Sequence, residues 1–376
     1  MFENMKKNEI TSEKKISIKQ LIYIIVTIVI TTESVFLPSF VASYAKEDSW
    51  ISVIISTIFS ALIFIIYYNL AMMFKDQNFF EYIEKIVGKF MGKIISILFI
   101  LFFLNVIFVV TRQLIEIMGN AFMPKTPSLV FLVVTLIPVM YAVSKDFSSI
   151  VKVNEILLPY GLFALIFIVA LSLPNIKIDN FMPILAKGIL PPIIGSFPIT
   201  SWVLESVILL AIFPQIEQKE KALKGGLLSI LIIGFISFLG LIAIGIFSAE
   251  VTTNMQFPLL EVTRNIRTGI YTQRFDSLIM SIWIAGIYIK ITVFTYLFLK
   301  GLTEILKCND QKFALIPMGI FLSILPIYGC KDMGYFYQYL KKIFTTENLI
   351  VEIIIPLLLF LIAKIKGLDK KEQNNK

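Results

Sequence analysis

Ten apolar segments, most of them about 20 residues long, occupy the greater part of this sequence. A helix of this length crosses the hydrocarbon core of a bilayer. The pattern therefore predicts an all-α polytopic membrane protein with ten transmembrane helices. The predicted spans are residues 20–42, 51–73, 94–118, 128–144, 156–173, 190–213, 227–249, 275–300, 313–330 and 349–365.

The composition excludes several classes of protein. Of the 376 residues, 57% are hydrophobic and 16% are charged, which is too apolar for a soluble domain. Histidine is absent from the sequence, and this excludes Ser-His and Cys-His catalysis and histidine-ligated zinc sites. The sequence carries neither a phosphate-binding glycine-rich loop nor a nucleic-acid motif. We expect no enzyme activity, no metal site, no cofactor and no nucleic-acid partner.

The basic residues predict the orientation in the membrane. Lys and Arg are concentrated in alternate loops, beginning with the N-terminal tail, and cytoplasmic loops carry an excess of these residues. With an even number of spans, both termini are predicted to be cytoplasmic. The net charge of +8 follows mostly from this topology. Cys308 would then lie inside and Cys330 near the outer face, so no disulfide is expected between them.

A polar interruption in the first span marks a candidate site. Residues 31–34, Thr-Thr-Glu-Ser, lie halfway along the apolar stretch 19–42. The carboxylate of Glu33 at this depth costs several kcal/mol unless it faces protein, water or a partner charge. Pro38 follows and has no N–H to donate, so we predict that the helix breaks in this region. Because Glu33 lies inside it and it is too long, the segment is not expected to be a cleaved signal peptide.

Two amphipathic linkers indicate an internal repeat. Residues 79–93 predict a helix on the cytoplasmic surface, and residues 257–267 predict a similar helix outside. Each follows the second span of a five-span half, on opposite faces of the membrane, as expected for an inverted repeat. The predicted division is a cytoplasmic tail at 1–18, a five-helix repeat at 19–173, an extracytoplasmic linker at 174–189, a second five-helix repeat at 190–365 and a cytoplasmic tail at 366–376.

The sixth span is interrupted in the same way as the first. Pro191, Pro192, Gly195 and Pro198 disrupt its helical pattern. Paired interruptions in corresponding spans point to a transporter binding site, and we predict that spans one and six meet near the midplane. The alternative is two kinked helices that pack for stability. The candidate ligand-binding residues are Thr32, Glu33, Ser34, Phe36, Gly195, Ser196, Phe197 and Glu205.

Three ionisable residues, Glu33, Glu205 and Lys290, are predicted at similar depth. Two acids and one base leave one negative charge uncompensated, which favours an incoming cation or a bound proton. The ammonium group of a ligand or a coupling proton would neutralise it. Lys290 would also be able to replace a metal cation between spans one and eight. The structural alternative is that Lys290 pairs with one Glu while the other faces a water-filled crevice.

A second charged pair lies toward the outer end of span three. Arg112 and Glu116 are four residues apart and can pair along one helix face. Either a gate at the site entrance or an intrahelical pair that reaches the membrane interface would explain them.

Stretches spread along nearly the whole chain resemble the B-subunit family of spore germinant receptors. This is the spore germination permease family of the amino acid-polyamine-organocation superfamily. The order and spacing of the stretches carry the resemblance. They are Leu37-Pro38 with DSWISV at 48–53, FEYIEKIVGKFMGK at 80–93, TRQLIEIM at 111–118, KTP at 125–127, FMPILAKGILPPI at 181–193, Glu205 with FPQI at 213–216, FPLLEVTRNI at 257–266 and RFDSLIMSIWI at 274–284.

The resemblance implies a ten-span inverted-repeat fold and a place in the inner membrane of a dormant spore. It implies that the chain works with an A-type membrane subunit and a lipoprotein C-type subunit, and that it senses a small nutrient germinant such as an amino acid or amine. A proton-coupled secondary transporter of amino acids or amines is the alternative. Many relatives have a glycine-rich break in span one, whereas this chain has polar residues at 31–34, which favours a cationic germinant or a protonated Glu33.

Overall fold

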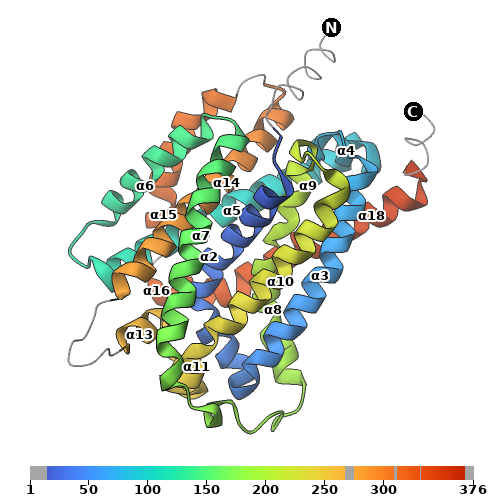
Figure 1. Cartoon of the computed structure of the whole chain (residues 1–376). Helices are drawn as coiled ribbons and strands as arrows, with labels where there is room; N and C mark the ends of the chain where they lie inside the picture. Colours follow the sequence, from blue (N-terminus) through green and yellow to red (C-terminus); the bar gives the residue numbers. More distant parts are fainter. Residues whose placement is uncertain (1–14, 267–274, 309–310, 331, 369–376) are drawn as a thin grey trace.

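The computed structural model describes residues 15–266, 275–308, 311–330 and 332–368, and within these ranges the regular elements are helices. The long helices run side by side as a bundle (Figure 1). The α-helices are α2 (Ile18–Ala45), α3 (Ser49–Met73), α4 (Phe79–Val87), α5 (Lys89–Ile117), α6 (Ser128–Val143), α7 (Phe147–Ser172), α8 (Leu190–Val203), α9 (Ile208–Ile212), α10 (Ala222–Gly240), α11 (Ile242–Phe247), α12 (Ala249–Thr253), α13 (Pro258–Arg264), α14 (Asp276–Leu306), α15 (Leu315–Tyr328), α16 (Met333–Gln338), α17 (Thr345–Leu349) and α18 (Ile355–Ile365).

Seven helical segments of the described chain are long and apolar enough to cross a membrane, judged by length and composition. The first, Ile18–Met73, contains both α2 and α3, which are joined by the short turn η1 (Lys46–Asp48). Two further apolar helices, α6 and α15, are shorter. This set is consistent with the ten predicted spans. Cys308 and Cys330 are both free thiols.

Helix α2 occupies the centre of the bundle (Figure 1) and packs against α8, α10, α14 and α7. The predicted break in span one is wrong: the α-helix is continuous from Ile18 to Ala45, with Pro38 inside it. Proline is tolerated in membrane helices when neighbouring helices support the backbone. The polar residues at 31–34 therefore act through their side chains, because their backbone stays helical.

The predicted break in span six is present, but at another place. Pro191 and Pro192 lie in the first turn of α8, where proline is compatible with a helix, and Pro198 lies inside α8. Regular α-helix ends at Val203, and a 3₁₀ turn, η5 (Leu204–Val207), separates α8 from α9. Glu205 lies within this turn.

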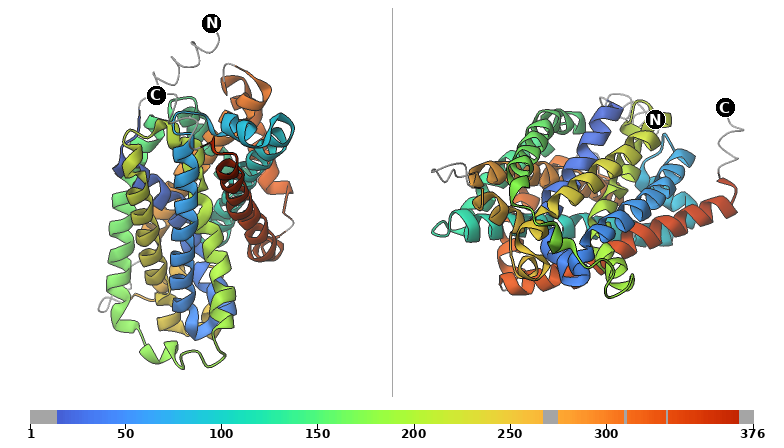
Figure 2. Two further views of the ribbon diagram at one scale, coloured as in Figure 1. Left: turned by 90° about the vertical axis from the view of Figure 1, so that its right-hand side faces the viewer. Right: turned by 60° about the horizontal axis from the view of Figure 1, so that its bottom comes forward.

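The tenth span differs most from its prediction. Helical structure begins at Met333 and ends at Ile365, instead of covering only 349–365. It includes two π-helical stretches, η9 (Tyr339–Phe344) and η10 (Ile350–Ile354). The polar residues at 341–348 interrupt the apolar pattern and conceal the first half of this segment. Two further views show α18 at the outside of the bundle, beside α3 (Figure 2).

The two predicted linker helices are present as α4 and α13, at opposite ends of the bundle (Figure 1). Helix α4 ends at Val87, before Gly88 with its positive φ of 86°, so the end of the predicted range 79–93 belongs to α5. Phe79, Phe80 and Ile83 of α4 are buried inside the protein. Residue 267, at the end of the second predicted linker, lies outside the described residues.

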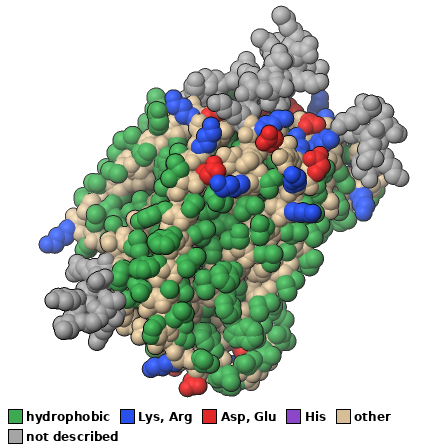
Figure 3. All heavy atoms as spheres, in the orientation of Figure 1, with side chains coloured by type: hydrophobic (Ala, Val, Ile, Leu, Met, Phe, Trp, Pro, Cys, Tyr) green, Lys and Arg blue, Asp and Glu red, His purple; other side chains and the backbone are tan. Residues whose placement is uncertain are grey.

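Charged side chains gather at the end of the bundle that carries α4, while apolar side chains cover the visible flank (Figure 3). The described chain begins and ends at this same end (Figure 1). A flank of apolar side chains is what a lipid-facing surface requires. The predicted tails at 1–18 and 366–376 lie mostly outside the described residues.

Candidate functional site

Lys290 joins three helical elements in the interior of the bundle. Its Nζ lies 2.5 Å from Oε2 of Glu205 in η5, and it donates a hydrogen bond of 2.6 Å to Oγ1 of Thr32 in α2. Lys290 is 1% exposed and Glu205 is fully buried. The other carboxylate oxygen of Glu205, Oε1, has no hydrogen-bond partner among the described residues. The structure thus brings spans one, six and eight together around one ion pair.

A glycine in α14 allows α2 and α14 to approach closely near this pair. A Cβ atom on Gly286 would lie 2.1 Å from Oγ1 of Thr31, which is far inside van der Waals contact. One turn earlier, Nε1 of Trp283 donates a 3.2 Å hydrogen bond to Oγ of Ser34. Gly286, Thr31, Ser34 and Trp283 also line a small cavity between α2, α7 and α14.

Glu33 faces a different neighbour from Thr32. Successive residues of an α-helix point about 100° apart, so that Thr32 reaches α14 while Glu33 reaches α10. Oε1 of Glu33 accepts a 2.7 Å hydrogen bond from Oγ of Ser237. Glu33 is 2% exposed, and it interacts electrostatically with Lys290 and Glu205. The acid is therefore part of the same charged group without forming a direct contact with the lysine.

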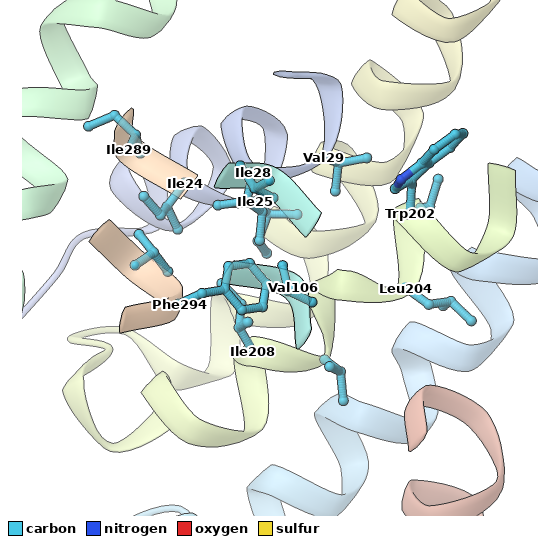
Figure 4. Packing of buried hydrophobic residues seen from close by; sticks show 14 of the residues in the cluster. Ile24, Ile25, Ile28, Val29, Val106, Trp202, Leu204, Ile208, Ile289 and Phe294 are labelled. Carbon is cyan, nitrogen blue, oxygen red and sulfur yellow. The ribbon is translucent and has the colours of Figure 1, made fainter. Parts of the chain in front are cut away.

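The remaining predicted ligand residues lie further along the bundle. Phe36 is buried in an aromatic cluster with Phe40, Phe257 and Tyr337, at centroid distances of 5.8, 5.9 and 6.2 Å. The apolar core continues on the other side, where Ile25 and Ile28 lie close to Val106 and Phe294 (Figure 4). Phe36 and Phe294 thus belong to the apolar surroundings of the charged residues.

The residues predicted from span six lie apart from this charged group, except Glu205. Gly195 packs against the end of α2, where an added Cβ would lie 3.2 Å from Ala45 Cβ. Oγ of Ser196 donates to the carbonyl of Ile193 within its own helix. Phe197 is 47% exposed and lines a groove beside the tenth span. A role in ligand binding for these three residues stays a prediction.

Arg112 and Glu116 form the predicted pair along α5, and Nε of Arg112 donates to Oε1 of Glu116 at 2.7 Å. Nη1 of Arg112 also donates to the carbonyls of Pro326 and Cys330, at 2.9 and 3.3 Å, at the end of α15. Pro326 lies in the last turn of α15 and Cys330 lies just beyond its end, where backbone carbonyls lack intrahelical donors. The pair therefore attaches span nine to span three.

A further buried acid, Glu352, is not among the site residues predicted from the sequence. Glu352 in η10 has no exposed surface, and it interacts electrostatically with Glu205 and Lys290. Its position between apolar residues at 349–358 was a usable signal, because an ionisable residue within a membrane span marks a functional candidate.

A family model described as spore germination protein matches residues 15–332 of the chain. The chain belongs to this family. Spore germination protein KB of Bacillus subtilis is 25% identical over 355 residues, which are 93% of this chain and 94% of that protein. Spore germination protein YndE of the same species is 25% identical over 317 residues, which are 83% of this chain and 87% of that protein. Spore germination protein XB of Bacillus anthracis is 25% identical, over 80% of this chain and 84% of that protein.

Solved structures of transporters share the fold of this family member. A Na⁺-coupled sialic acid symporter, in a substrate-bound outward-open state, aligns with a TM-score of 0.59 and 13% identity, over 89% of this chain and 78% of the symporter. A mutant manganese transporter of Eremococcus coleocola aligns with a TM-score of 0.51 and 14% identity, over 90% and 85% of the two chains. At these identities the likeness concerns the fold alone.

Proposed function

We propose that this protein is the membrane subunit of a spore germinant receptor and that it binds a small germinant, an amino acid or an amine, between spans one and six. It signals germination together with an A-type and a lipoprotein C-type subunit in the spore inner membrane, with both termini cytoplasmic. The observation that carries the proposal is the ion pair of Lys290 and Glu205, with Thr32 bound to the same ammonium group.

The charges favour a ligand with an ammonium group. Glu205 Oε1 has no hydrogen-bond partner in the described structure, and Glu33 adds a second acid that interacts with Glu205 and Lys290. An incoming ammonium group competes with Lys290 for Glu205 and makes up for the excess of acid over base. When Lys290 leaves Glu205, the link between η5, α2 and α14 loosens. The ligand thereby changes the relative population of two arrangements of these helices, which the partner subunits detect.

A proton-coupled secondary transporter of amino acids or amines is the second candidate, and the fold that the chain shares with solved transporters favours it. A receptor and a transporter need the same pocket, and they differ in whether the ligand crosses the membrane. Uptake of radiolabelled compounds into proteoliposomes that contain the purified chain alone separates the two. Uptake above that of empty vesicles would favour the transporter.

A thermal-shift screen tests the binding site itself. The purified protein is heated with amino acids, amines and nucleosides over a range of pH, because a ligand that binds only the folded state raises the apparent melting temperature. The Glu205→Gln variant is screened in parallel. A compound that stabilises the wild type and fails to stabilise the variant supports the site. A compound that stabilises both equally places binding elsewhere and contradicts the proposal.

A further inference from the structure

Glu352 lies in the π-helical stretch η10 of the tenth span. Its side chain has no exposed surface, and neither carboxylate oxygen has a hydrogen-bond partner within the described part of the chain. The nearby hydroxyl group of Tyr67 donates instead to the backbone carbonyl of Glu352, at 2.5 Å. Short π-helical stretches inside α-helices are frequent at functional sites. The carboxylate is thus held in the interior by the backbone, with its own oxygens unused.

Other unpaired polar groups occur on the two segments that meet here. The stretch η10 packs against η5. In η5, Ser206 Oγ and one oxygen of Glu205 have no hydrogen-bond partner among the residues described. One turn before Glu352, the side-chain oxygen and nitrogen of the buried Asn348 also have none. Most buried polar groups in proteins are hydrogen-bonded. A proton on the Glu352 carboxylate would turn one of its oxygens into a hydrogen-bond donor beside these unpaired polar atoms.

The surrounding charges do not compensate an ionised Glu352. Lys290 interacts with it electrostatically, but its ammonium group is in contact with Glu205 and Thr32. On α5, Arg112 is paired with Glu116 and bound to the end of α15. The basic residue of α18, Lys364, lies over the ring of Phe360.

The acids around Lys290 outnumber the bases. Glu33, Glu205 and Glu352 all interact electrostatically with Lys290. An ionised Glu352 beside the Glu205–Lys290 pair would be a buried charge without a partner of its own, which is strongly destabilising. A carboxyl group in this environment takes up a proton and becomes neutral.

We propose that Glu352 is a proton-binding site. One oxygen of its carboxylate accepts a proton from a hydronium ion: an O–H bond forms on the carboxyl group, one O–H bond of the hydronium ion breaks, and a water molecule is released. The site holds the proton while Lys290 stays on Glu205, and it releases the proton when Lys290 moves to Glu352. This proposal concerns the resting protein and does not depend on the identity of a germinant.

Infrared spectroscopy of the reconstituted protein tests the proposal. A protonated carboxyl group inside a membrane protein gives a C=O stretching band that is separate from the bands of carboxylates. We expect a band near neutral pH that disappears at high pH, is lost in Glu352→Gln and is kept in Glu347→Gln. Glu347 is the matched control because it is an exposed acid five residues earlier on the same helical segment. A band that survives unchanged in Glu352→Gln would overturn the proposal.

Three further measurements keep the test decisive. If Glu352→Gln does not fold, Glu352→Asp keeps an acid at this place and shifts the band, whereas an unshifted band contradicts the assignment. In Glu205→Gln, Lys290 loses its partner and becomes available to Glu352, so the Glu352 band should decrease; an undiminished band would refute the exchange. Spectra with Na⁺ replaced by choline check for a metal cation. A band that appears only without Na⁺ would show that Na⁺ occupies the carboxylate when it is present, and would overturn the proton as the occupant of the resting site.

Discussion

Lys290 Nζ lies 2.5 Å from Glu205 Oε2 at the place where the sixth span leaves α-helical geometry. The pair connects the middle of α14 with the 3₁₀ turn between α8 and α9. Both side chains are excluded from solvent, so each charge depends on the other. A change that separates them affects the packing of spans one, six and eight together, because Thr32 binds the same ammonium group.

We expect Lys290→Met to lower the stability of the protein by about 3–5 kcal/mol, because Glu205 would remain as an uncompensated buried charge. The double variant Lys290→Met/Glu205→Gln removes both charges and should recover most of this loss. Thermal or denaturant unfolding of the purified proteins in detergent measures the difference. Equal stability of the single and double variants would show that the pair is not coupled.

Gly286→Ala tests the close approach of α14 to α2. The added Cβ would lie 2.1 Å from Thr31 Oγ1, so that the Thr31 side chain or one of the two helices must shift, and overpacking of this kind costs about 1–3 kcal/mol. Gly240→Ala in α10 is the matched control, because no atom lies within 4 Å of its added Cβ, and alanine favours the helix by up to about 1 kcal/mol. The melting temperature should fall in the first variant and hold or rise in the second. A Gly286→Ala protein as stable as the control would contradict this packing.

The membrane class, most of the helices and the charged residues Glu33, Glu205 and Lys290 could be predicted from the sequence, because apolar length and intramembrane charge are local signals. The positions at which a helix stays continuous or breaks could not be predicted in the same way. Pro38 stays inside a continuous helix, and the break near Glu205 contains no proline. Both outcomes depend on neighbouring helices, which a single sequence does not place.

Contacts between segments that are distant in the chain could not be predicted from the sequence either. Gly195 lies opposite Ala45 and Ser52, which its missing side chain accommodates, and its predicted role in ligand binding stays a prediction. Glu352 lies inside the predicted span 349–365, but its position opposite η5, which carries Glu205, could not be read from the sequence. In each case the decisive fact is which helix lies opposite, and that information comes from tertiary packing.

Arg112→Lys should destabilise the protein although it keeps the charge. The guanidinium group contacts Glu116 and the carbonyls of Pro326 and Cys330 at once, and an ammonium group has no comparable planar fork. We expect a loss of about 2 kcal/mol or more, since hydrogen bonds of charged groups contribute about 1.5–3 kcal/mol each. Lys341→Arg, on the tenth segment, is a charge-conserving control. Unfolding midpoints compare the two, and an unchanged midpoint in Arg112→Lys would favour a role for Arg112 other than attachment of span nine.

Glu33→Gln should weaken the binding of an ammonium ligand while the fold is kept. The glutamine side-chain oxygen can still accept the hydrogen bond that Ser237 now donates to Glu33 at 2.7 Å, and loss of a buried charge eases membrane insertion. The negative charge that attracts a cation is lost, however. Interactions of charged groups contribute about 1.5–3 kcal/mol, so we expect binding at least about tenfold weaker, measured by titration of the compound found in the thermal-shift screen.

Ser237→Ala separates the charge of Glu33 from its hydrogen bond. This variant keeps the carboxylate and removes its only hydrogen-bond donor among the described residues. If the charge attracts the ligand, Ser237→Ala should bind it more tightly than Glu33→Gln does, even if Ser237→Ala is the less stable protein. The reverse order would mean that the Glu33–Ser237 contact shapes the pocket and that the charge itself does not act on the ligand. Glu33 would then be a structural link between α2 and α10.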